Sequence, residues 1–596
     1  MASMTSASWS GPDQAATSRA LATSTSQMAL SIGPPDPETR RRAPLAAADC
    51  SLAGSPISSS TSSAEPLPPI ELDVTGLRML KRFVLLSVGS CLVLLLGWVA
   101  PRSVAAAEDG APDLAARLDR LLAEKPLAHA SVGIYVERAS DASIVYARGA
   151  DRLLIPASNQ KILTAVATLS RFGPTHRFST RVWAGALPDA NGVVPELLVE
   201  GGGDPAMNSE DWWRLAADLR REGLRGVSGD LRIDDTLFDG PGWHPSWGKV
   251  SARAYHAPVG ALTANYGSFF VSVWPQAEVG SAALVDIDPP VDYLRLHNRA
   301  RTAPRGTRPR LSVGRAAGRA SEGPIEEVVR VEGLTRQGDG VDRFPRSVLD
   351  PGLYAGSLLA LQLEANGIFV DGEVRRDPRG EEESLLLLLD RPGRSVAEAV
   401  ALCMKYSNNS IAESLVKNLA AWSGVETGGG PARQGEWVEG IRALRAELVR
   451  LGVDLGETTI VDGSGLSLQN RTSPRVLATA LRVGRASFRI GPEFVSSMPI
   501  AELDGTLEKR LRGGRGRIRA KTGLLSDVSA TALSGYAERA DGETLIFSIV
   551  VNGHSGGSST AMDAVDRLAY TLLDAEIGER LSSAAAKPAR FDSNTP

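Results

Sequence analysis

A serine and a lysine stand three positions apart in the segment 156–169, which reads PASNQKILTAVATL. If this segment is helical, Ser158 and Lys161 lie on one face, so the amine can reach the hydroxyl. Serine needs an adjacent base to become a nucleophile, and lysine can be that base only when burial or nearby positive charge lowers its pKa. The pair therefore predicts attack on a carbonyl carbon, with a second lysine close by.

Two other pairs have the same spacing, Ser246 with Lys249 and Ser414 with Lys417. A proline and a glycine interrupt any helix around the first pair, and the second lies deep inside a helical run. Ser158 instead follows a proline at the start of a long apolar-periodic helix, where free backbone N–H groups and the helix dipole favour an anion. An ordinary N-cap serine beside a solvated lysine remains the alternative.

Two later segments complete a possible constellation: Ser407 and Asn409 in SNN, and Lys521 at the start of KTG. Each has an ordinary explanation by itself, a helix cap in the first case and a strand end with an exposed lysine in the second. Together, and in this order after Ser-x-x-Lys, they match the motif set of serine β-lactamases and penicillin-binding proteins.

The residue types suit acyl transfer. Ser407 can relay a proton to the leaving nitrogen, and Asn409 can offer its amide to the substrate backbone. Lys521 and Thr522 can bind a terminal carboxylate. The positive charge of Lys521 would also help to keep Lys161 neutral.

Backbone groups complete the expected site. The N–H groups of Ser158 and Leu524 would form an oxyanion hole, a feature worth roughly 10² to 10³ in rate per donor. Gly523 would let the substrate lie close to the strand edge.

Composition excludes other classes of protein. The chain has 596 residues, 43% hydrophobic residues and a formal net charge of -4, so it is typical of a soluble globular protein and nucleic acid is not an expected partner. Its six histidines are scattered without a zinc-binding spacing, so we expect no metal and no cofactor. Cys403, the one cysteine expected in the mature chain, is interpreted as a core residue.

The N-terminal region predicts export. Residues 1–78 have the Ser-, Ala- and Pro-rich composition of a disordered extension, and we expect translation to begin at Met79. From there a basic start, an apolar run over 83–100 and small residues near Ala107 predict a signal peptide. An uncleaved membrane anchor remains the alternative, because the run approaches a spanning length of about 18 to 20 residues. Either way we expect a periplasmic or other extracytoplasmic location.

The rest of the chain alternates between element types. We expect a helix at 114–122, strands at 130–136 and 143–147, and then the Ser158 helix. Residues 178–390 are mostly short strands and turns, with a basic exposed loop at 301–318. After residue 391 helices return, followed by three antiparallel strands that start near residues 518, 530 and 545. The predicted domains are a disordered extension (1–78), a signal peptide or anchor (79–107), a catalytic domain in two parts (108–177 and 391–580) around an insertion (178–390), and a disordered tail (581–596).

From about residue 114 to 573 the chain resembles the D-alanyl-D-alanine carboxypeptidase/endopeptidase family of class C low-molecular-mass penicillin-binding proteins. The gap of about 250 residues between Ser158 and Ser407 is the most diagnostic feature. Compact β-lactamases have only a short insertion there. Beyond the three catalytic motifs, the resemblance rests on LVEGGGDP (198–205), YHAPVGAL (255–262), DGSGLS (462–467) and DGTL (504–507).

The resemblance implies an α/β (α+β) serine β-lactamase/transpeptidase-like domain. A five-stranded antiparallel sheet is flanked by helices and carries two inserted β-rich domains. It also implies cleavage of D-Ala-D-Ala termini or cross-links of peptidoglycan through an acyl-enzyme, with penicillins acylating the same serine. Asp234 and Phe238 match an acidic and an aromatic residue that line a pocket for the substrate's side-chain amine. Gln469 follows Leu468 where the family often has arginine, which leaves the preference of that pocket open.

Two other functions remain open. A serine β-lactamase would turn over β-lactams rapidly, although no matching deacylating glutamate motif is present. A catalytically idle wall-binding protein would bind peptidoglycan without releasing D-Ala. Peptidoglycan peptides and β-lactam antibiotics are therefore the expected partners, and membrane association stays open.

Overall fold

The computed structural model describes residues 113–318, 326–423 and 434–574. The predicted disordered extension (1–78), signal peptide or anchor (79–107) and disordered tail (581–596) lie outside these residues. In the part that is described, no helix is long and apolar enough to cross a membrane. All of the described residues belong to one structural unit that runs from Ala111 onward.

Five antiparallel strands form the sheet that supports the catalytic motifs, in the order β17-β18-β19-β1-β2. The predicted five-stranded antiparallel sheet is therefore confirmed, and the KTG motif lies on its edge strand, β17. Strands β18 and β19 are buried on both faces, as their long runs of small and apolar residues require. The strands are β1 (Ser131–Arg138), β2 (Ile144–Arg148), β17 (Ile518–Leu525), β18 (Ala530–Glu538) and β19 (Thr544–Asn552).

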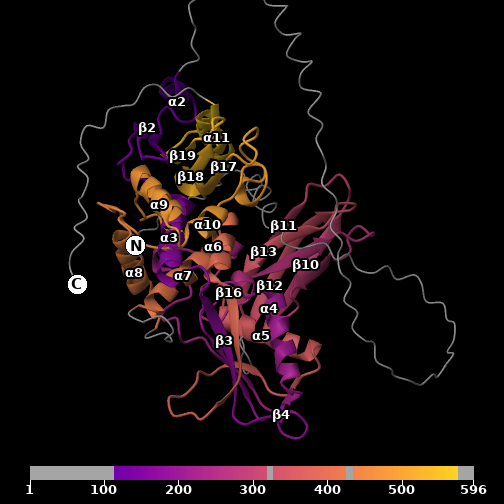
Figure 1. The fold of residues 1–596 in the computed structure, drawn as a ribbon. Helices are drawn as coiled ribbons and strands as arrows, with labels where there is room; N and C mark the ends of the chain where they lie inside the picture. Colours follow the sequence, from indigo (N-terminus) through magenta and orange to yellow (C-terminus); the bar gives the residue numbers. More distant parts are fainter. Residues whose placement is uncertain (1–112, 319–325, 424–433, 575–596) are drawn as a thin grey trace, which may run out of the picture. The chain divides into compact units, whose positions relative to one another are not determined.

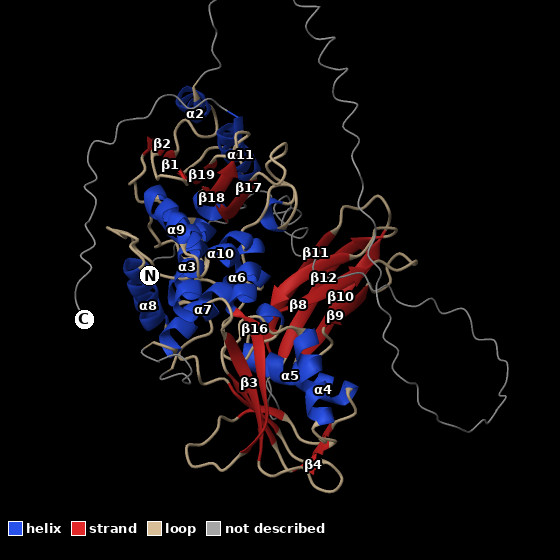
Figure 2. Cartoon of the chain, viewed as in Figure 1, coloured by secondary structure: helices blue, strands red, loops and turns tan. Residues whose placement is uncertain are grey.

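Helices cover both faces of this sheet (Figures 1 and 2). Leu533 of β18 points into one core, together with residues of α2 and α11, whereas its neighbour Ala532 points into the other core, which includes α3 and α9. The helices of the two faces are α2 (Leu114–Ala123), α3 (Gln160–Phe172), α6 (Val396–Lys405), α7 (Asn409–Ala421), α8 (Trp437–Arg450), α9 (Pro474–Ala486), α10 (Gly491–Ser496) and α11 (Ser558–Asp574).

The region predicted as an insertion (178–390) begins and ends along two paired strands. Strand β3 pairs antiparallel with β16, and Arg177 lies opposite Ser395. Four sheets fill the insertion, in the orders β15-β7-β5-β3-β16, β10-β12-β11, β13-β8-β9 and β14-β6-β4. Their strands are β3 (Arg177–Ala184), β4 (Val193–Val194), β5 (Leu197–Gly201), β6 (Gly226–Val227), β7 (Leu231–Asp234), β8 (Ser268–Trp274), β9 (Leu284–Asp288), β10 (Leu294–Ala303), β11 (Arg310–Ala317), β12 (Glu327–Arg336), β13 (Asp342–Ser347), β14 (Phe369–Val370), β15 (Val374–Arg376) and β16 (Leu386–Ser395).

The insertion also contains two helices that the strand-rich prediction missed, α4 (Ser209–Arg221) and α5 (Pro351–Ala365). For α4 the signal was present, because Asn208 and Asp211 form a capping box in front of apolar residues at helical spacing. In α5 the apolar residues surround the helix, so there is no polar stripe for a periodicity argument to find.

The basic segment 301–318, predicted as an exposed loop, is instead largely strand. Strands β10 and β11 both pair with β12, in parallel and antiparallel fashion respectively. Val313 is buried and Arg315 faces the buried Glu327, whereas Arg301 and Arg310 are exposed, because one face of this small sheet packs on the core. Its basic composition therefore described the outer face of a sheet rather than the absence of regular structure.

Short 3-10 turns join several of these elements near the site. They are η2 (Ala157–Asn159), η3 (Pro245–Trp247), η4 (Ala254–His256), η5 (Asn265–Gly267), η6 (Gly505–Leu507) and η7 (Ser526–Val528).

Candidate active site

The segment that carries Ser158 is tied to the sheet on both sides. Asn552 of β19 accepts the N–H of Ile155 at 2.8 Å and donates to its carbonyl at 3.0 Å. One residue beyond the serine, Asn159 donates its side-chain amide to Ser534 of β18 at 2.7 Å. The side chains of Asn552 and Asn159 therefore fix the position of Ser158 relative to the strands.

The backbone before Ser158 is constrained more tightly than a regular helix start. Ala157 has φ of +48°, a left-handed conformation that is costly for a residue with a side chain. A Cβ on Gly465 would lie 1.9 Å from the Ala157 carbonyl oxygen, and one on Gly523 would lie 2.9 Å from that of Pro156. Gly523 thus makes room for the chain that leads into the serine, a reason different from the predicted approach of substrate.

Lys161 is fully buried beside the serine, on the first turn of α3. Its Nζ lies 3.1 Å from Ser158 Oγ and donates to Asn409 Oδ1 and to the Ser464 carbonyl, both at 2.7 Å. Burial lowers the pKa of Lys161 to about 8. A neutral amine has two N–H donors and one lone pair, so two contacts can take the hydrogens while the lone pair faces the serine hydroxyl.

The second lysine predicted near this pair is Lys521. Its Nζ donates to Ser407 Oγ at 2.8 Å and to the Thr522 carbonyl at 2.7 Å, and Ser407 has φ of +57°. Burial, and then the nearby Lys161, lower the pKa of Lys521 well below its usual range. Burial is also the main cause of the lowered pKa of Lys161. The positive charge of Lys521, which we expected to help keep Lys161 neutral, is therefore not the leading effect.

The insertion reaches the same site through two contacts that sequence reasoning did not assign. Asn409 donates Nδ2 to the Tyr255 carbonyl at 2.9 Å, and Trp247 donates Nε1 to Asp462 Oδ2 at 2.8 Å. Tyr255 begins the motif YHAPVGAL, so the signal was visible, but it served only to support the family resemblance.

A buried carboxylate lies behind Lys161, and it was also missed. Glu413 accepts hydrogen bonds from the N–H groups of Gly463 (3.1 Å) and Ser464 (2.8 Å) and from Trp437 Nε1 (3.0 Å). Burial raises the pKa of Glu413 to about 7. Its position six residues after Ser407, on the second turn of α7, was the available signal.

The edge strand β17 carries the remaining predicted substrate contacts. Thr522 donates its hydroxyl to Thr506 Oγ1 at 2.8 Å, which links KTG to the DGTL motif. Leu524 lies opposite Thr531 of β18, two residues further along the same edge. The edge position leaves backbone groups of β17 for a substrate to pair with.

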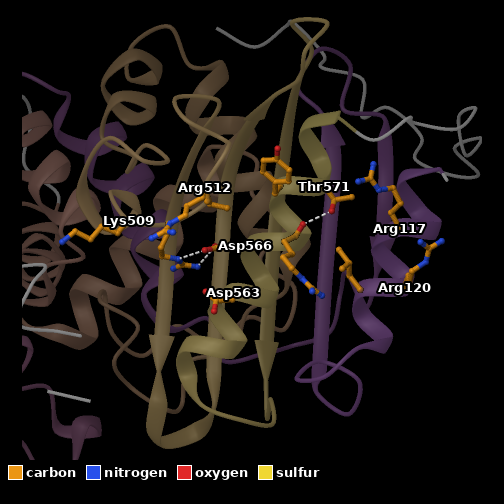
Figure 3. Close-up of a pocket in the computed structure, with 12 residues that line it drawn as sticks. Arg117, Arg120, Lys509, Arg512, Asp563, Asp566 and Thr571 are labelled. Carbon is orange, nitrogen blue, oxygen red and sulfur yellow. Dashed lines mark hydrogen bonds and ion pairs between the residues drawn. The ribbon is translucent and has the colours of Figure 1, made fainter. Parts of the chain in front are cut away.

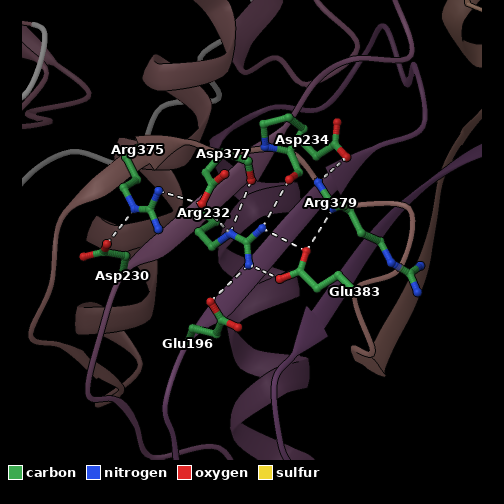
Figure 4. A network of polar contacts seen from close by, with 10 residues as sticks. Glu196, Asp230, Arg232, Asp234, Arg375, Asp377, Arg379 and Glu383 are labelled. Atoms are coloured by element: carbon green, nitrogen blue, oxygen red, sulfur yellow. Dashed lines mark hydrogen bonds and ion pairs between the residues drawn. The ribbon is translucent and has the colours of Figure 1, made fainter.

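Asp234 and Phe238 are engaged elsewhere. Asp234 accepts the Thr236 N–H and hydroxyl at one oxygen and the Arg379 N–H at the other, inside the polar network of Figure 4. Phe238 lies in the hydrophobic core with 8% exposure, and Lys417 Nζ is 5.7 Å from its ring centroid. The predicted role of these two residues in a substrate pocket stays a prediction.

Lys417, which has the same spacing from Ser414 as Lys161 has from Ser158, contacts other groups. Lys417 Nζ lies 4.0 Å from the ring centroid of Trp437 and donates to the Gly435 carbonyl at 3.4 Å, so it is held by a cation–π contact rather than by a serine. Across residues 113–318, 326–423 and 434–574, no group of three His, Cys, Asp or Glu side chains could hold a metal ion.

Comparison with known proteins gives a consistent result over almost all of the described chain. A sequence model of the D-Ala-D-Ala carboxypeptidase 3 (S13) family matches residues 114–572. The D-alanyl-D-alanine carboxypeptidase of Actinomadura sp. (strain R39) is 35% identical over 476 residues, which cover 77% of this chain and 84% of that protein. DacB of Haemophilus influenzae, also named a D-alanyl-D-alanine carboxypeptidase, is 24% identical over 72% of this chain and 86% of its own length.

Among solved structures, penicillin binding protein 4 (dacB) from Haemophilus influenzae has the same fold. It superposes with a TM-score of 0.63 at 22% identity, covering 76% of this chain and 98% of that one.

Proposed function

The chain belongs to the D-Ala-D-Ala carboxypeptidase 3 (S13) family and is a D-Ala-D-Ala carboxypeptidase, and we propose that Ser158 is its nucleophile. One observation carries this assignment. Lys161 Nζ lies 3.1 Å from Ser158 Oγ while two other acceptors hold its hydrogens, and burial lowers its pKa to about 8. Ser158 can therefore lose its proton to Lys161 as it attacks a carbonyl.

Acylation forms the bond from Ser158 Oγ to the carbonyl carbon of the penultimate D-Ala and breaks the peptide bond to the terminal one. The proton taken by Lys161 must reach the leaving nitrogen. Ser407 stands beside Lys521 Nζ at 2.8 Å and is the residue we assign to that relay. Water then hydrolyses the acyl-enzyme, with Lys161 again accepting a proton.

Substrate recognition follows from β17 and α7. The N–H groups of Ser158 and Leu524 stabilise the oxyanion of the tetrahedral intermediate. Thr522 and Lys521 bind the terminal carboxylate. Asn409 uses one Nδ2 hydrogen for Tyr255, which leaves the other for a substrate carbonyl.

The substrates we propose are the stem peptides of peptidoglycan. The solved structure of the Haemophilus influenzae protein in complex with a β-lactam supports the proposal that β-lactams acylate Ser158 here too. Peptidoglycan lies outside the cytoplasm, so we propose export of the enzyme through the 79–107 segment. N-terminal sequencing of the exported protein tests both the start of translation and the removal of that segment.

Replacing Ser158 tests the assignment directly. Ser158→Ala should abolish labelling by a fluorescent penicillin and release of D-Ala from a stem pentapeptide. Ser246→Ala, which removes the serine of a second Ser-x-x-Lys pair, should leave both unchanged. Labelling that survives in Ser158→Ala would show that another residue is the nucleophile.

The same preparations distinguish the two rival functions. Rapid hydrolysis of a chromogenic β-lactam, in place of a long-lived adduct, would identify a β-lactamase. Peptidoglycan binding without release of D-Ala from the wild-type enzyme would identify a catalytically idle protein.

A further inference from the structure

A basic hollow of about 500 Å³ lies between α2, α11 and the loop at 509–512. Six cationic side chains line it, together with two acidic ones, Asp563 and Asp566. The cations are Arg117, Arg120, Lys509, Arg510, Arg512 and Arg567. This excess of positive charge is local, because the whole chain has a net charge of -4.

Internal ion pairs account for only part of this charge. Arg510 is bound by Asp566 at 2.7 Å, and Arg567 pairs with Glu124. Within the described part of the chain, Arg117, Arg120, Lys509 and Arg512 form no ion pair. Asp563, which forms no ion pair among the described residues, offsets one of these four charges. Holding the remaining like charges around one hollow costs electrostatic energy, and a bound anion would relieve this cost.

The scaffold under the hollow is well ordered. Leu114 and Leu118 on the buried face of α2 pack into the same core as Val565 and Leu568 of α11. Arg117 and Arg120 are three positions apart, so they share the exposed side of α2. In the view of Figure 3 they lie on one side of Thr571, and Arg512 lies on the other.

We propose that this hollow is a binding site for a phosphate group with more than one negative charge or more than one phosphate. Five of the six cations are arginines, whose planar guanidinium groups bind phosphate oxygens in pairs. The positive charges that Asp563 leaves unbalanced exceed what a single carboxylate can neutralise. The hollow is also large enough for a phosphorylated headgroup or a short run of phosphodiesters.

Two sources could supply this chemistry, a soluble phosphate compound or the headgroups of an anionic membrane. Residues 101–113 connect the apolar run at 83–100 to α2, and 13 residues reach at most roughly 45 Å when extended. If that run stays in a membrane, the basic hollow is tethered near a surface whose anionic headgroups attract arginine and lysine.

Binding of inorganic pyrophosphate, measured by calorimetry at low salt, tests the proposal with the full-length protein. Arg117→Gln/Arg120→Gln should weaken the affinity by about tenfold or more. The control Arg299→Gln/Arg330→Gln removes two exposed, unpaired arginines from β10 and β12 and should change the affinity less than twofold. Arg512→Gln, on the loop, provides a second variant that leaves α2 untouched.

Vesicles distinguish the two sources. The protein is sedimented with vesicles of phosphatidylglycerol or of phosphatidylcholine. A membrane headgroup site is identified if wild-type protein sediments only with phosphatidylglycerol and Arg117→Gln/Arg120→Gln sediments with neither. Pyrophosphate binding without vesicle binding would identify a soluble phosphate site. The proposal is overturned if wild-type protein binds neither probe, or if both double variants lose binding equally.

Discussion

Glu413 and Lys161 contact the same residue, Ser464, from its two backbone groups. The Glu413 carboxylate accepts the N–H of Ser464 at 2.8 Å, and the carbonyl of the same residue accepts from Lys161 Nζ at 2.7 Å. Both side chains are fully buried, so little water screens the charge of Glu413 from the amine. Glu413 is thus placed to act on Lys161 in two ways, by orienting its acceptor and by favouring its protonated form.

Glu413→Gln should therefore change the pH profile as well as the rate. Removing a nearby negative charge disfavours the ammonium form, so the pKa of Lys161 falls and the acidic limb of kcat/KM moves to lower pH. The amide also presents N–H groups to backbone donors, and we expect kcat to fall by about tenfold from the disturbed geometry. If the acidic limb stays at the same pH, the charge of Glu413 does not raise the pKa of Lys161.

Asn409→Asp should move the limb in the opposite direction. The new carboxylate would lie where the amide oxygen now accepts from Lys161 Nζ at 2.7 Å, and it would favour the ammonium form. The acidic limb should then move to higher pH, and activity at pH 7 should drop by about tenfold or more, the factor given by one pKa unit. Asn408→Asp, one residue earlier at the helix cap, is the matched control and should leave the limb in place.

The wild-type enzyme should itself show an acidic limb near pH 8. Lys161 acts as a base only when neutral, and burial lowers its pKa to about 8. As pH falls below this value the lysine gains its proton, so kcat/KM should decline about tenfold per unit of pH. Acylation rates by a penicillin should follow the same curve, because the same proton transfer is needed. A profile that stays flat from pH 6 to 9 would contradict Lys161 as the base.

Thr506→Val should weaken substrate binding more than turnover. Thr522 donates its single hydroxyl hydrogen to Thr506 at 2.8 Å when no substrate is bound. When the terminal carboxylate binds, we assign that hydrogen to the carboxylate, and Thr506 can then donate its own hydrogen to Thr522 Oγ1 and keep the hydroxyl in place. We expect KM for a D-Ala-D-Ala peptide to rise by roughly five- to tenfold, about the effect of one hydrogen bond, with kcat nearly unchanged. A substrate amidated at its C-terminus should show a much smaller difference between the variants.

Arg232→Met should destabilise the inserted region. The buried Arg232 guanidinium binds Glu196 and Asp377, each at 3.1 Å, and also Glu383 (Figure 4). Its removal leaves three carboxylates facing one another, and because they are partly exposed we expect a loss of about 2 to 3 kcal/mol in the free energy of unfolding. Urea denaturation measures this loss. Arg214→Met, which removes an exposed ion pair on α4, should cost no more than about 0.5 kcal/mol.

Several features followed from local sequence. The capping box of Ser395 and Glu398 starts α6 as expected, and the strands near residues 518, 530 and 545 are present as β17, β18 and β19. Hydrophobic period and cap residues act over one or two turns, so they can be read without knowing what the segment packs against. The three motifs predicted acyl transfer, and together with the gap of about 250 residues and four further motifs they supported the resemblance that implied the five-stranded sheet and the carboxypeptidase family.

Other features depended on partners far along the chain. The basic segment at 301–318 became strand because β12 supplies the hydrogen bonds for β10 and β11. The motif around Asp234 did not show that Thr236 and Arg379 donate hydrogen bonds to its two oxygens. Tyr255, which had no assigned role, is the residue whose carbonyl contacts Asn409.

The sequence by itself determined which residue types were available for acyl transfer and the elements that carry them. The tertiary structure decided that Lys161 and Asn409, 248 positions apart, meet at 2.7 Å, and that Glu413 and Ser464 complete the surroundings of the lysine. It also decided the protonation chemistry, because the pKa of a lysine depends on how completely the whole fold removes it from water. Burial of that kind is a property of packing between distant segments, and no local pattern of residues encodes it.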